Sequence, residues 1–504
     1  MERIAIIDLG SNSVRLVIME INDRGAYRII NEVKETVRLS EGMGADNILK
    51  PDAIRRTMQT LRLFKNLCEA SDITDTIAVA TAAVRKARNQ QEFLQLIQMD
   101  TGISFEVISG VREAELGFKG VVHTLDIEDG FVVDIGGAST EVTKFIDRKI
   151  VEAFSFPFGA VNLTEMFLEK NSNTQKQIDA LEKFLTKQYT SIPWLRNNIS
   201  AMPLIGLGGT IRALSKIDRM KKGYSLDVTH NYRMNNSDIE AIYNSMKYMN
   251  LEERLLLPGM AKDRADIIIA GTSAVNMLLK VLRASRFIIS GSGIREGMFY
   301  EHYLHRLSSS GYTNIINASI DNILKLYNVN LSHVEQVKKI ALTIFDQLGI
   351  VHKLGKEHRI VLERAALLHD VGIIIDFYNR DEHTYYILTN SRINGLDHKE
   401  IILTALAASK FTGEKLRRHY VKHRDIISKE DYSAVRKLIA ILMISDKLDR
   451  SKASIITSVD CRIKADKVIL ATEKLMGEGE LEVAEANKMQ GIFKKTFRKD
   501  LVIT

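Results

Sequence analysis

Two short segments rich in glycine and hydroxyl residues each follow an acidic residue at the end of an apolar run. Asp8 precedes residues 9–13, and Asp134 precedes residues 135–140, after which Glu141 follows. Glycine lets backbone N–H groups approach a phosphate closely, and Ser and Thr hydroxyls add donors. Two acids that face one pocket across a tight turn can hold a hard cation through water. The pattern predicts a phosphate and metal site, although a surface Asp at a strand end is the simpler interpretation of either acid alone.

Two further glycine turns follow apolar segments later in the chain. Residues 206–210 follow the apolar residues 203–205, and residues 290–293 follow the apolar residues 287–289. Each turn is expected to open a helix, whose N-terminus adds partial positive charge. One such turn is weak support, since most glycine turns are only turns. Four of them in one chain favour phosphate binding.

The elements that must position the two acidic turns are predicted to be β-hairpins. Apolar residues 3–8 and 14–21 flank the first turn, and residues 130–134 and 141–145 flank the second. A strand on each side of a small-residue turn is typical of a hairpin rather than of a strand–helix unit. Periodicity adds helices at 51–71 and 92–99 and a strand at 77–81.

The character of the sequence changes twice in its second half. From about residue 303 strand signals fade, and helical patterns rich in His continue to about residue 452. Short β-like runs return at 459–464 and 468–471. Four parts are therefore expected, with boundaries uncertain by several residues. They are residues 1–118, residues 119–302, a helical part at 303–452 and a small α+β part at 453–504.

Six segments, in the same order along the chain, resemble the exopolyphosphatase/guanosine pentaphosphate phosphohydrolase family. They are residues 8–16, 81–85, 108–116, 134–141, 208–212 and 291–297. The resemblance spans essentially the whole chain, and one departure is Ala138, where the family usually has a third glycine. It implies an α/β fold with two actin-like (ASKHA, ribonuclease H-like) lobes and the substrate in the cleft between them. An all-α HD-like domain and a small α+β C-terminal domain are expected to follow.

The resemblance also implies roles for individual residues. Glu113 matches the glutamate that activates the attacking water, and Arg85 matches an arginine that contacts phosphate. Asp134 and Glu141 match the residues that hold Mg²⁺, and Asp8 is expected to assist the metal or the water. Without the family match, Glu113 would be interpreted as an acid at a helix N-terminus. The residues expected to line the phosphate path are Asn12, Ser13, Gly136, Gly137, Ser139, Gly208, Gly209 and Thr210.

A second candidate metal site lies in the C-terminal half. The residues His333, His369, Asp370 and Asp446 follow the order of the HD phosphohydrolase domain, which they resemble. His and carboxylate ligands on facing helices can close around a divalent metal. Lys410 stands where family members often have a further His, which argues against two metal ions. Other members have lost these ligands, so a purely structural domain remains open.

The formal net charge of +7 and pI of about 9.0 favour anionic partners. Arg417 and Arg418 belong to a basic segment, residues 415–424, that is either a solvated helix face or a rail for a long polyanion. No nucleic-acid partner is expected. No membrane partner is expected either, because no apolar stretch approaches 18 residues.

The cysteines and the N-terminus point to the cytoplasm. Cys68 and Cys461 are far apart and lack a C-x-x-C context, so a disulfide framework is not predicted. The apolar run at residues 4–7 is too short for a signal peptide. A cytoplasmic location is therefore expected.

The expected function is that of an exopolyphosphatase, a hydrolase of phosphoanhydride bonds that releases orthophosphate from inorganic polyphosphate with Mg²⁺ and Glu113. Conversion of guanosine pentaphosphate (pppGpp) to tetraphosphate (ppGpp) would use the same residues and stays open. A sugar kinase is disfavoured, because no nucleoside motif is evident. A non-catalytic sensor of polyphosphate or of these nucleotides would not need Glu113. A homodimer is expected from the family, while chain-length preference and dependence on K⁺ are left open.

Overall fold

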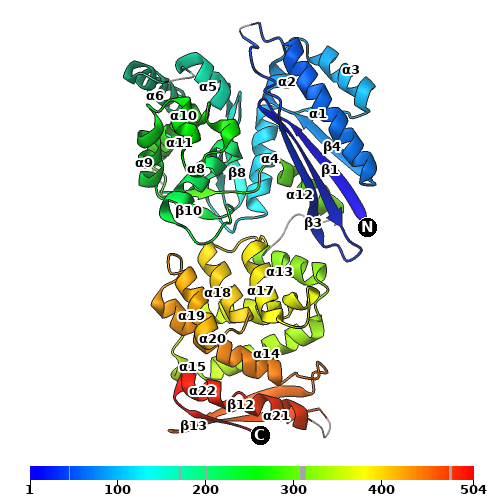
Figure 1. Cartoon of the computed structure of the whole chain (residues 1–504), viewed down its shortest axis with the longest axis vertical. Coiled ribbons are helices and arrows are strands. Elements are labelled where there is room, and N and C mark those ends of the chain that lie inside the picture. The colour runs from blue at the N-terminus through cyan, green and yellow to red at the C-terminus, as the bar shows by residue number, and fades with distance from the viewer. Residues whose placement is uncertain (45, 170–171, 199–200, 307–313, 476–478) are drawn as a thin grey trace. The chain divides into compact units, whose positions relative to one another are not determined.

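The computed structural model describes residues 1–44, 46–169, 172–198, 201–306, 314–475 and 479–504. These residues form two compact units (Figure 1). The first comprises Met1–Tyr224 and Thr229–Ile315, and the second comprises Ser225–Val228 and Ile316–Thr504. Within the described residues, no helix has the length and apolar character needed to cross a membrane.

The first sheet of the first unit has the strand order β3-β2-β1-β4-β5. Its strands are β1 (Glu2–Leu9), β2 (Ser13–Ile21), β3 (Tyr27–Thr36), β4 (Asp75–Ala80) and β5 (Glu106–Val107). Strands β1, β2 and β3 pair antiparallel with one another, whereas β4 runs parallel to β1 and β5 runs parallel to β4. The hairpin expected around residues 9–13 is confirmed as β1 and β2.

The second sheet repeats this design. Its order is β10-β11-β9-β6-β7-β8, in which β6, β7 and β8 form the antiparallel part and β9 and β11 the parallel part. The added strand β10 runs antiparallel to β11 at the edge. Its strands are β6 (Gly130–Ile135), β7 (Thr140–Ile146), β8 (Lys149–Phe156), β9 (Leu204–Leu207), β10 (Tyr232–Met234) and β11 (Phe287–Ile289). The first unit therefore consists of two actin-like, ribonuclease H-like lobes.

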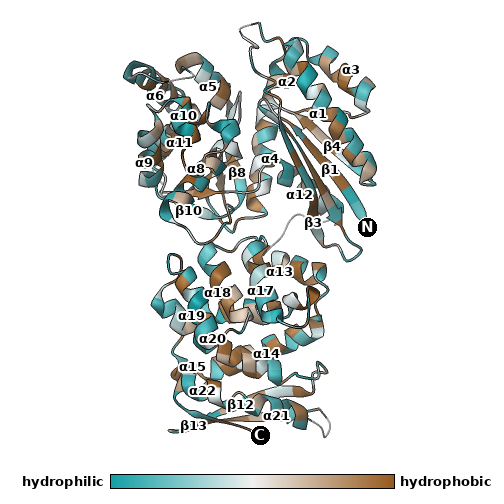
Figure 2. Ribbon diagram, in the orientation of Figure 1, coloured by the Kyte–Doolittle hydropathy of each residue, from teal (hydrophilic) through white to brown (hydrophobic). Residues whose placement is uncertain are grey.

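Both faces of β1 are buried, which explains its continuous apolar run. Ala5, Ile7 and Leu9 belong to a core that the sheet shares with α1 (Pro51–Ala70) and α3 (Gln90–Thr101). Ile4 and Ile6 face a separate core. Figure 2 shows the resulting band of hydrophobic residues along β1 and β4.

The helices around the second sheet surround one large core. Residues of the sheet pack there with residues of the longer helices, among which α11 is buried along most of its length. These helices are α5 (Ala160–Phe167), α6 (Gln175–Thr190), α8 (Gly208–Lys222), α9 (Asn236–Met246) and α11 (Ile268–Leu282). The shorter helical segments of the unit are α2 (Ala82–Lys86), α7 (Pro193–Arg196), α10 (Leu251–Leu255) and η1 (Lys262–Arg264).

Two helices connect the lobes. Helix α4 (Gly110–Val122) packs on β6, β7 and β8, whereas α12 (Ile294–Arg306) packs on β1. The two helices also pack on each other at glycines. A Cβ atom added at Gly297 would lie 1.9 Å from the carbonyl oxygen of Leu116, and one added at Gly120 would lie 2.2 Å from that of Gly293. The boundary expected at residue 118 therefore falls inside α4, which packs on the second sheet. The boundary expected at residue 303 falls inside α12, which packs on the first sheet.

The second unit is a helical bundle followed by a small sheet. Helices α14, α16, α18 and α20 pack on one another, and α14 and α20 also contact the C-terminal elements. The helices are α13 (Ile315–Leu326), α14 (Leu331–Gln347), α15 (Gly349–His352), α16 (Lys356–Leu368), η2 (Val371–Ile374), α17 (Arg380–Asn390), α18 (His398–Ala408), α19 (Gly413–Lys422) and α20 (Lys429–Lys447). The sheet has the order β12-β13-β14 and comprises β12 (Ile456–Ile463), β13 (Lys467–Lys474) and β14 (Asp500–Ile503), with α21 (Glu480–Asn487) and α22 (Gln490–Phe497) between the last two strands.

Candidate active site

A pocket lies where the turns of the two hairpins approach each other in the first unit. Residues 10–13 of the first turn and residues 135–137 of the second line it. A Cβ atom added at Gly137 would lie 3.1 Å from the Cβ atom of Ser11 and 3.4 Å from the backbone nitrogen of Asn12. Glycine at this position therefore lets the two turns come together. Between them, their N–H and hydroxyl groups can surround a phosphate group.

Two helices begin at the pocket wall. Gly208 and Gly209 open α8 there, and Ile294 opens α12. Gly208 has a φ of +90°, and an added Cβ atom would lie 2.7 Å from Oδ1 of Asp134. This position requires glycine for both reasons. The partial positive charge of each helix N-terminus makes the wall attractive to anions.

Among the acids of the hairpins, Asp8 and Asp134 are half-buried and line the pocket, whereas Glu141 is buried. Asp8 pairs across its hairpin with Arg15, whereas Asp134 pairs across its hairpin with Glu141. Burial raises the pKa of Asp8, and burial together with the nearby Asp8 raises the pKa of Asp134 to about 6. Burial and the negative charges of Glu113 and Asp134 hold the pKa of Glu141 well above its usual range. The site thus concentrates negative charge that a cation would relieve.

Glu113 lies in the first turn of α4 and reaches the pocket. The guanidinium of Arg85 donates to Oε2 of Glu113 at 3.0 Å and to the carbonyl oxygen of Ile108 at 2.8 Å. Burial raises the pKa of Glu113 to about 7, with Arg85 opposing the shift and the nearby Asp134 and Asp8 adding to it. A carboxylate with a pKa near neutrality is suited to accept a proton from water.

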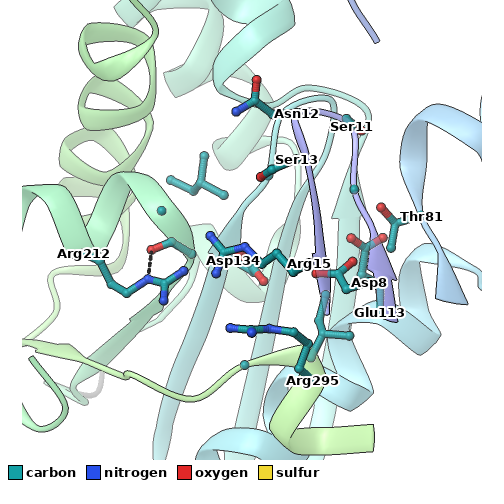
Figure 3. A pocket seen from close by; sticks show the side chains of 18 of the residues that line it. Asp8, Ser11, Asn12, Ser13, Arg15, Thr81, Glu113, Asp134, Arg212 and Arg295 are labelled. Atoms are coloured by element: carbon teal, nitrogen blue, oxygen red, sulfur yellow. Dashed lines mark hydrogen bonds between the residues drawn. The ribbon is translucent and has the colours of Figure 1, made fainter. Parts of the chain in front are cut away.

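Four arginines line the same pocket: Arg15, Arg212, Arg264 and Arg295. Figure 3 shows three of them, Arg15, Arg212 and Arg295, turned toward the space beside Asp134. Arg212 donates to the carbonyl oxygen of Gly208 at 3.4 Å, and Arg295 donates to Glu32 at 2.7 Å. Burial and the neighbouring Arg212 and Arg295 lower the pKa of Arg15 to about 10. Cations that repel one another in this way favour an anion among them.

The donor set of the pocket fits a hard cation held partly through water. Its carboxylates offer only oxygen, the ligand that Mg²⁺ prefers. Among the described residues, these acids do not bring three ligand oxygens within 4.8 Å of one another. An Mg²⁺ ion here would therefore keep several waters, as this ion usually does in proteins.

Comparison with known proteins shows to which family the chain belongs. The profile of the Ppx/GppA phosphatase family matches residues 17–306, and that of Ppx/GppA phosphatase, domain III, matches residues 315–481. The chain belongs to the Ppx/GppA phosphatase family. It is similar to the solved structure of the Aquifex aeolicus family member, with 31% identity, a TM-score of 0.53, and coverage of 60% of this chain and 98% of that chain. It is also similar to an exopolyphosphatase from Cytophaga hutchinsonii, with 25% identity, a TM-score of 0.55, and coverage of 60% and 98%.

In this Ppx/GppA phosphohydrolase most residues predicted for the phosphate path line the pocket. They are Asn12, Ser13, Gly136, Gly137, Ser139, Gly208 and Gly209, together with Asp8, Glu113 and Asp134. Three other predicted residues, Arg85, Glu141 and Thr210, lie behind the residues that line the pocket. Arg85 contacts Glu113, Glu141 accepts a hydrogen bond from Ser155 at 2.7 Å, and Thr210 is fully buried in the first turn of α8.

The remaining predicted residues of the Ppx/GppA chain lie in the second unit. Arg417 and Arg418 are exposed on α19 and are not among the residues that line the pocket. His333, His369 and Asp370 place their ligand atoms within 4.8 Å of one another. Oδ1 of Asp446 lies 3.6 Å from Nε2 of His333 and 3.4 Å from Nε2 of His369.

The pocket arginines of this Ppx/GppA protein were not assigned a role from the sequence. Arg15, Arg212 and Arg295 lie inside the segments that resemble the family. Their position next to the glycine turns could have identified them as residues of the pocket. Arg264 has no such signal, because it lies in η1 far from any motif. A Cβ atom added at Gly209 would lie 2.5 Å from the guanidinium of Arg264, so the third glycine turn is what admits this side chain.

Proposed function

We propose that this phosphohydrolase is an exopolyphosphatase, which removes terminal phosphates from inorganic polyphosphate. The observation that carries the proposal is a second cavity in the first unit that shares Arg15, Gly209, Arg212 and Arg264 with the pocket. It adds the cationic side chains of Lys34, Lys216 and Arg219 and the acidic side chains of Glu32 and Asp263, of which Asp263 pairs with Lys34, so that cations still outnumber acids in its lining. Positive charge therefore continues beyond the pocket, as a phosphate chain would require.

The lining of the two cavities favours a polymer over a nucleotide. None of the described residues that line either cavity is aromatic. A guanine base gains affinity by stacking on an aromatic ring, whereas a phosphate chain needs only cations and N–H donors along its length. Both candidate substrates use the same terminal phosphate site, so the second cavity is where they would be distinguished.

The chain's own groups support in-line attack by water on the terminal phosphorus. The glycine turns and helix N-termini hold the terminal phosphate, and Glu113 accepts the proton of the attacking water. Arg85 orients Glu113, and the pocket arginines stabilise the charge on the transferred group. Mg²⁺ held near Asp8, Asp134 and Glu141 would neutralise phosphate oxygens.

The test compares orthophosphate release from long-chain polyphosphate and from guanosine pentaphosphate at several salt concentrations with Mg²⁺. Faster release from the polymer, with a rate that falls as salt rises, is expected. Lys216→Met should raise KM for the polymer and reduce its salt dependence, because one cation that contacts the chain is lost. The matched control is Lys221→Met, which removes an exposed charge from the same helix outside both cavities.

Each other outcome assigns a different function. Preference for the nucleotide, with Lys216→Met behaving like Lys221→Met, would move the function to guanosine pentaphosphate hydrolysis. Absence of release from both substrates, with polyphosphate still bound, would support a non-catalytic sensor.

A further inference from the structure

Three consecutive carbonyl groups of the second glycine turn are held by donors that lie outside the pocket. The carbonyl oxygens of Gly136 and Gly137 accept from the backbone N–H groups of the first two residues of α5, each at 2.9 Å. The carbonyl oxygen of Ala138 accepts from Nζ of Lys86 at 2.9 Å. The start of a helix thus holds two of the three carbonyl groups, and a single side chain holds the third.

The direction of these carbonyl groups fixes the direction of the N–H groups that follow them. In a trans peptide the C=O and N–H bonds point to opposite sides of a flat group. Because the carbonyl group of Ala138 is turned to Lys86, the N–H of Ser139 points the other way, toward the pocket that Ser139 lines. Among the described residues, no backbone carbonyl oxygen accepts from the N–H groups of residues 137–139. These three buried residues therefore offer N–H donors that suit an anion.

Lys86 reaches this turn from the other lobe of the first unit. It is the last residue of α2, which packs on β4, whereas Ala138 lies between β6 and β7. Its Nζ also donates to the carbonyl oxygen of Pro157 at 3.3 Å. The preceding residue, Arg85, donates to Glu113 at 3.0 Å. One short helix therefore holds both the proposed base and the peptide group of a phosphate donor, which sets the distance between base and phosphate.

We propose that Lys86 is a positioning residue: it orients the peptide group between Ala138 and Ser139 so that the N–H of Ser139 donates to the phosphate that is transferred. The inference rests on the proposed hydrolysis at this pocket, whichever substrate supplies the phosphate. Lys86 acts through the turn, since it does not line either cavity. Without its amino group, the peptide group is free to turn its carbonyl oxygen toward the phosphate, where two negative groups would repel each other.

The first experiment measures kcat and KM on the substrate that the unaltered protein hydrolyses faster. Lys86→Met removes the donor and keeps the length of the side chain. Its kcat should fall about 10- to 100-fold, less than loss of an oxyanion-hole donor costs, because the N–H is displaced and not deleted. KM should change less than kcat. Lys86→Arg keeps N–H donors and should restore most of the rate, and Arg88→Met, which removes an exposed charge nearby, is the matched control. If Lys86→Met behaves like Arg88→Met, or if Lys86→Arg restores nothing, the proposal is wrong.

The second experiment measures the affinity for inorganic phosphate and for orthovanadate by titration calorimetry with Mg²⁺. Vanadate adopts the five-coordinate geometry of in-line attack, so its binding should depend more on a correctly directed N–H. Lys86→Met should bind vanadate at least about tenfold more weakly and phosphate with a smaller loss. These measurements need no turnover, so they test Lys86 even if neither polyphosphate nor guanosine pentaphosphate is hydrolysed. Equal losses for the two ligands, or no loss for either, would overturn the role of Lys86 and leave the proposed function standing.

Discussion

Glu113 is held between opposing electrostatic influences. Arg85 stabilises its charged form at 3.0 Å, while burial and the nearby Asp8 and Asp134 favour the protonated form. The balance leaves its pKa at about 7, where a carboxylate is both available and basic at neutral pH. An acid that only capped a helix would not need such surroundings.

Replacing Glu113 tests the proposed base directly. Glu113→Gln should reduce the rate of phosphate release about 100- to 10,000-fold, because the amide cannot accept the proton of water. Binding of polyphosphate, measured by calorimetry, should remain nearly unchanged. Glu115→Gln is the matched control, since Glu115 pairs with Arg112 and does not line the pocket. Unchanged turnover in Glu113→Gln would remove Glu113 from the mechanism.

The pH dependence of kcat/KM should reflect the same group. A base acts when deprotonated, so kcat/KM should rise with pH toward about 7 and then level. Arg85 lowers the pKa of Glu113, so Arg85→Gln should raise that pKa and move the rising limb to higher pH, besides lowering the maximum. Arg88→Gln removes an exposed charge nearby and should leave the profile in place. If the rising part of the pH profile stays in place in Arg85→Gln, Arg85 does not set the pKa of Glu113.

Residues differ in how far the sequence reveals them. Glu113, Asp134 and the glycines belong to ordered motifs, so the resemblance identifies them. Glu141 and Thr210 also belong to motifs, but their burial behind the pocket wall depends on strand register and helix packing. Arg264 reaches the pocket only because the chain folds back through η1, and no local pattern records such a long-range approach.

At the scale of elements, the glycines between α4 and α12 set the position of Glu113. Helix α4 carries Glu113 and α12 carries Arg295, and the backbones approach closely at Gly120 and Gly297. The two helices thus act as one support that holds the base and a pocket arginine at a fixed separation.

An added methyl group in this contact should disturb both stability and catalysis. Gly297→Ala should lower the free energy of unfolding by about 1–3 kcal/mol, because the new Cβ atom would push against the backbone of Leu116. It should also lower kcat by moving Glu113. Gly491→Ala, in a helix where the added methyl meets open space, should be neutral or stabilising. Denaturant unfolding and phosphate release measure the two effects. Equal stability of the two variants would show that the contact is not tight.

Helices and strands with a clear sequence pattern were predicted well, but the elements that they pack against were not. The hairpins follow from apolar runs on each side of a small-residue turn, and α1 and α3 follow from helical spacing. The exchange of α4 and α12 between lobes does not follow, since an apolar helix face indicates burial without naming the sheet that buries it. The same limitation explains why the expected boundaries fall within helices.

At the scale of the molecule, the buried acids link the stability of the first unit to protons and metal. The pKa values of Glu113, Asp134 and Glu141 are raised in the folded chain, so the folded state binds more protons than the unfolded state between about pH 4.5 and 7. Without metal, the free energy of unfolding should therefore fall as pH rises through this window.

Mg²⁺ should reverse this loss. Calorimetric melting in chelator and in Mg²⁺ is expected to show a larger stabilisation by Mg²⁺ at about pH 7.5 than at about pH 5.5, because protons compete with the ion for the same carboxylates. Asp134→Asn should melt higher than the unaltered chain in chelator at the higher pH and gain less from Mg²⁺. An equal rise in melting temperature with Mg²⁺ at both pH values would show that the ion does not bind to these carboxylates.

The two hairpins share one topology, but the residue that pairs with the acid of each differs in charge. Arg15 stands opposite Asp8, where Glu141 stands opposite Asp134. One hairpin of the pocket therefore carries its own counter-charge at this position, whereas the other pairs two acids, which the arginines of the pocket offset only in part. A linear phosphate chain has two identical ends, yet between these sides its neighbouring groups meet different surroundings. Under the proposed function, this difference between the two hairpins would set the direction in which a phosphate chain enters the pocket.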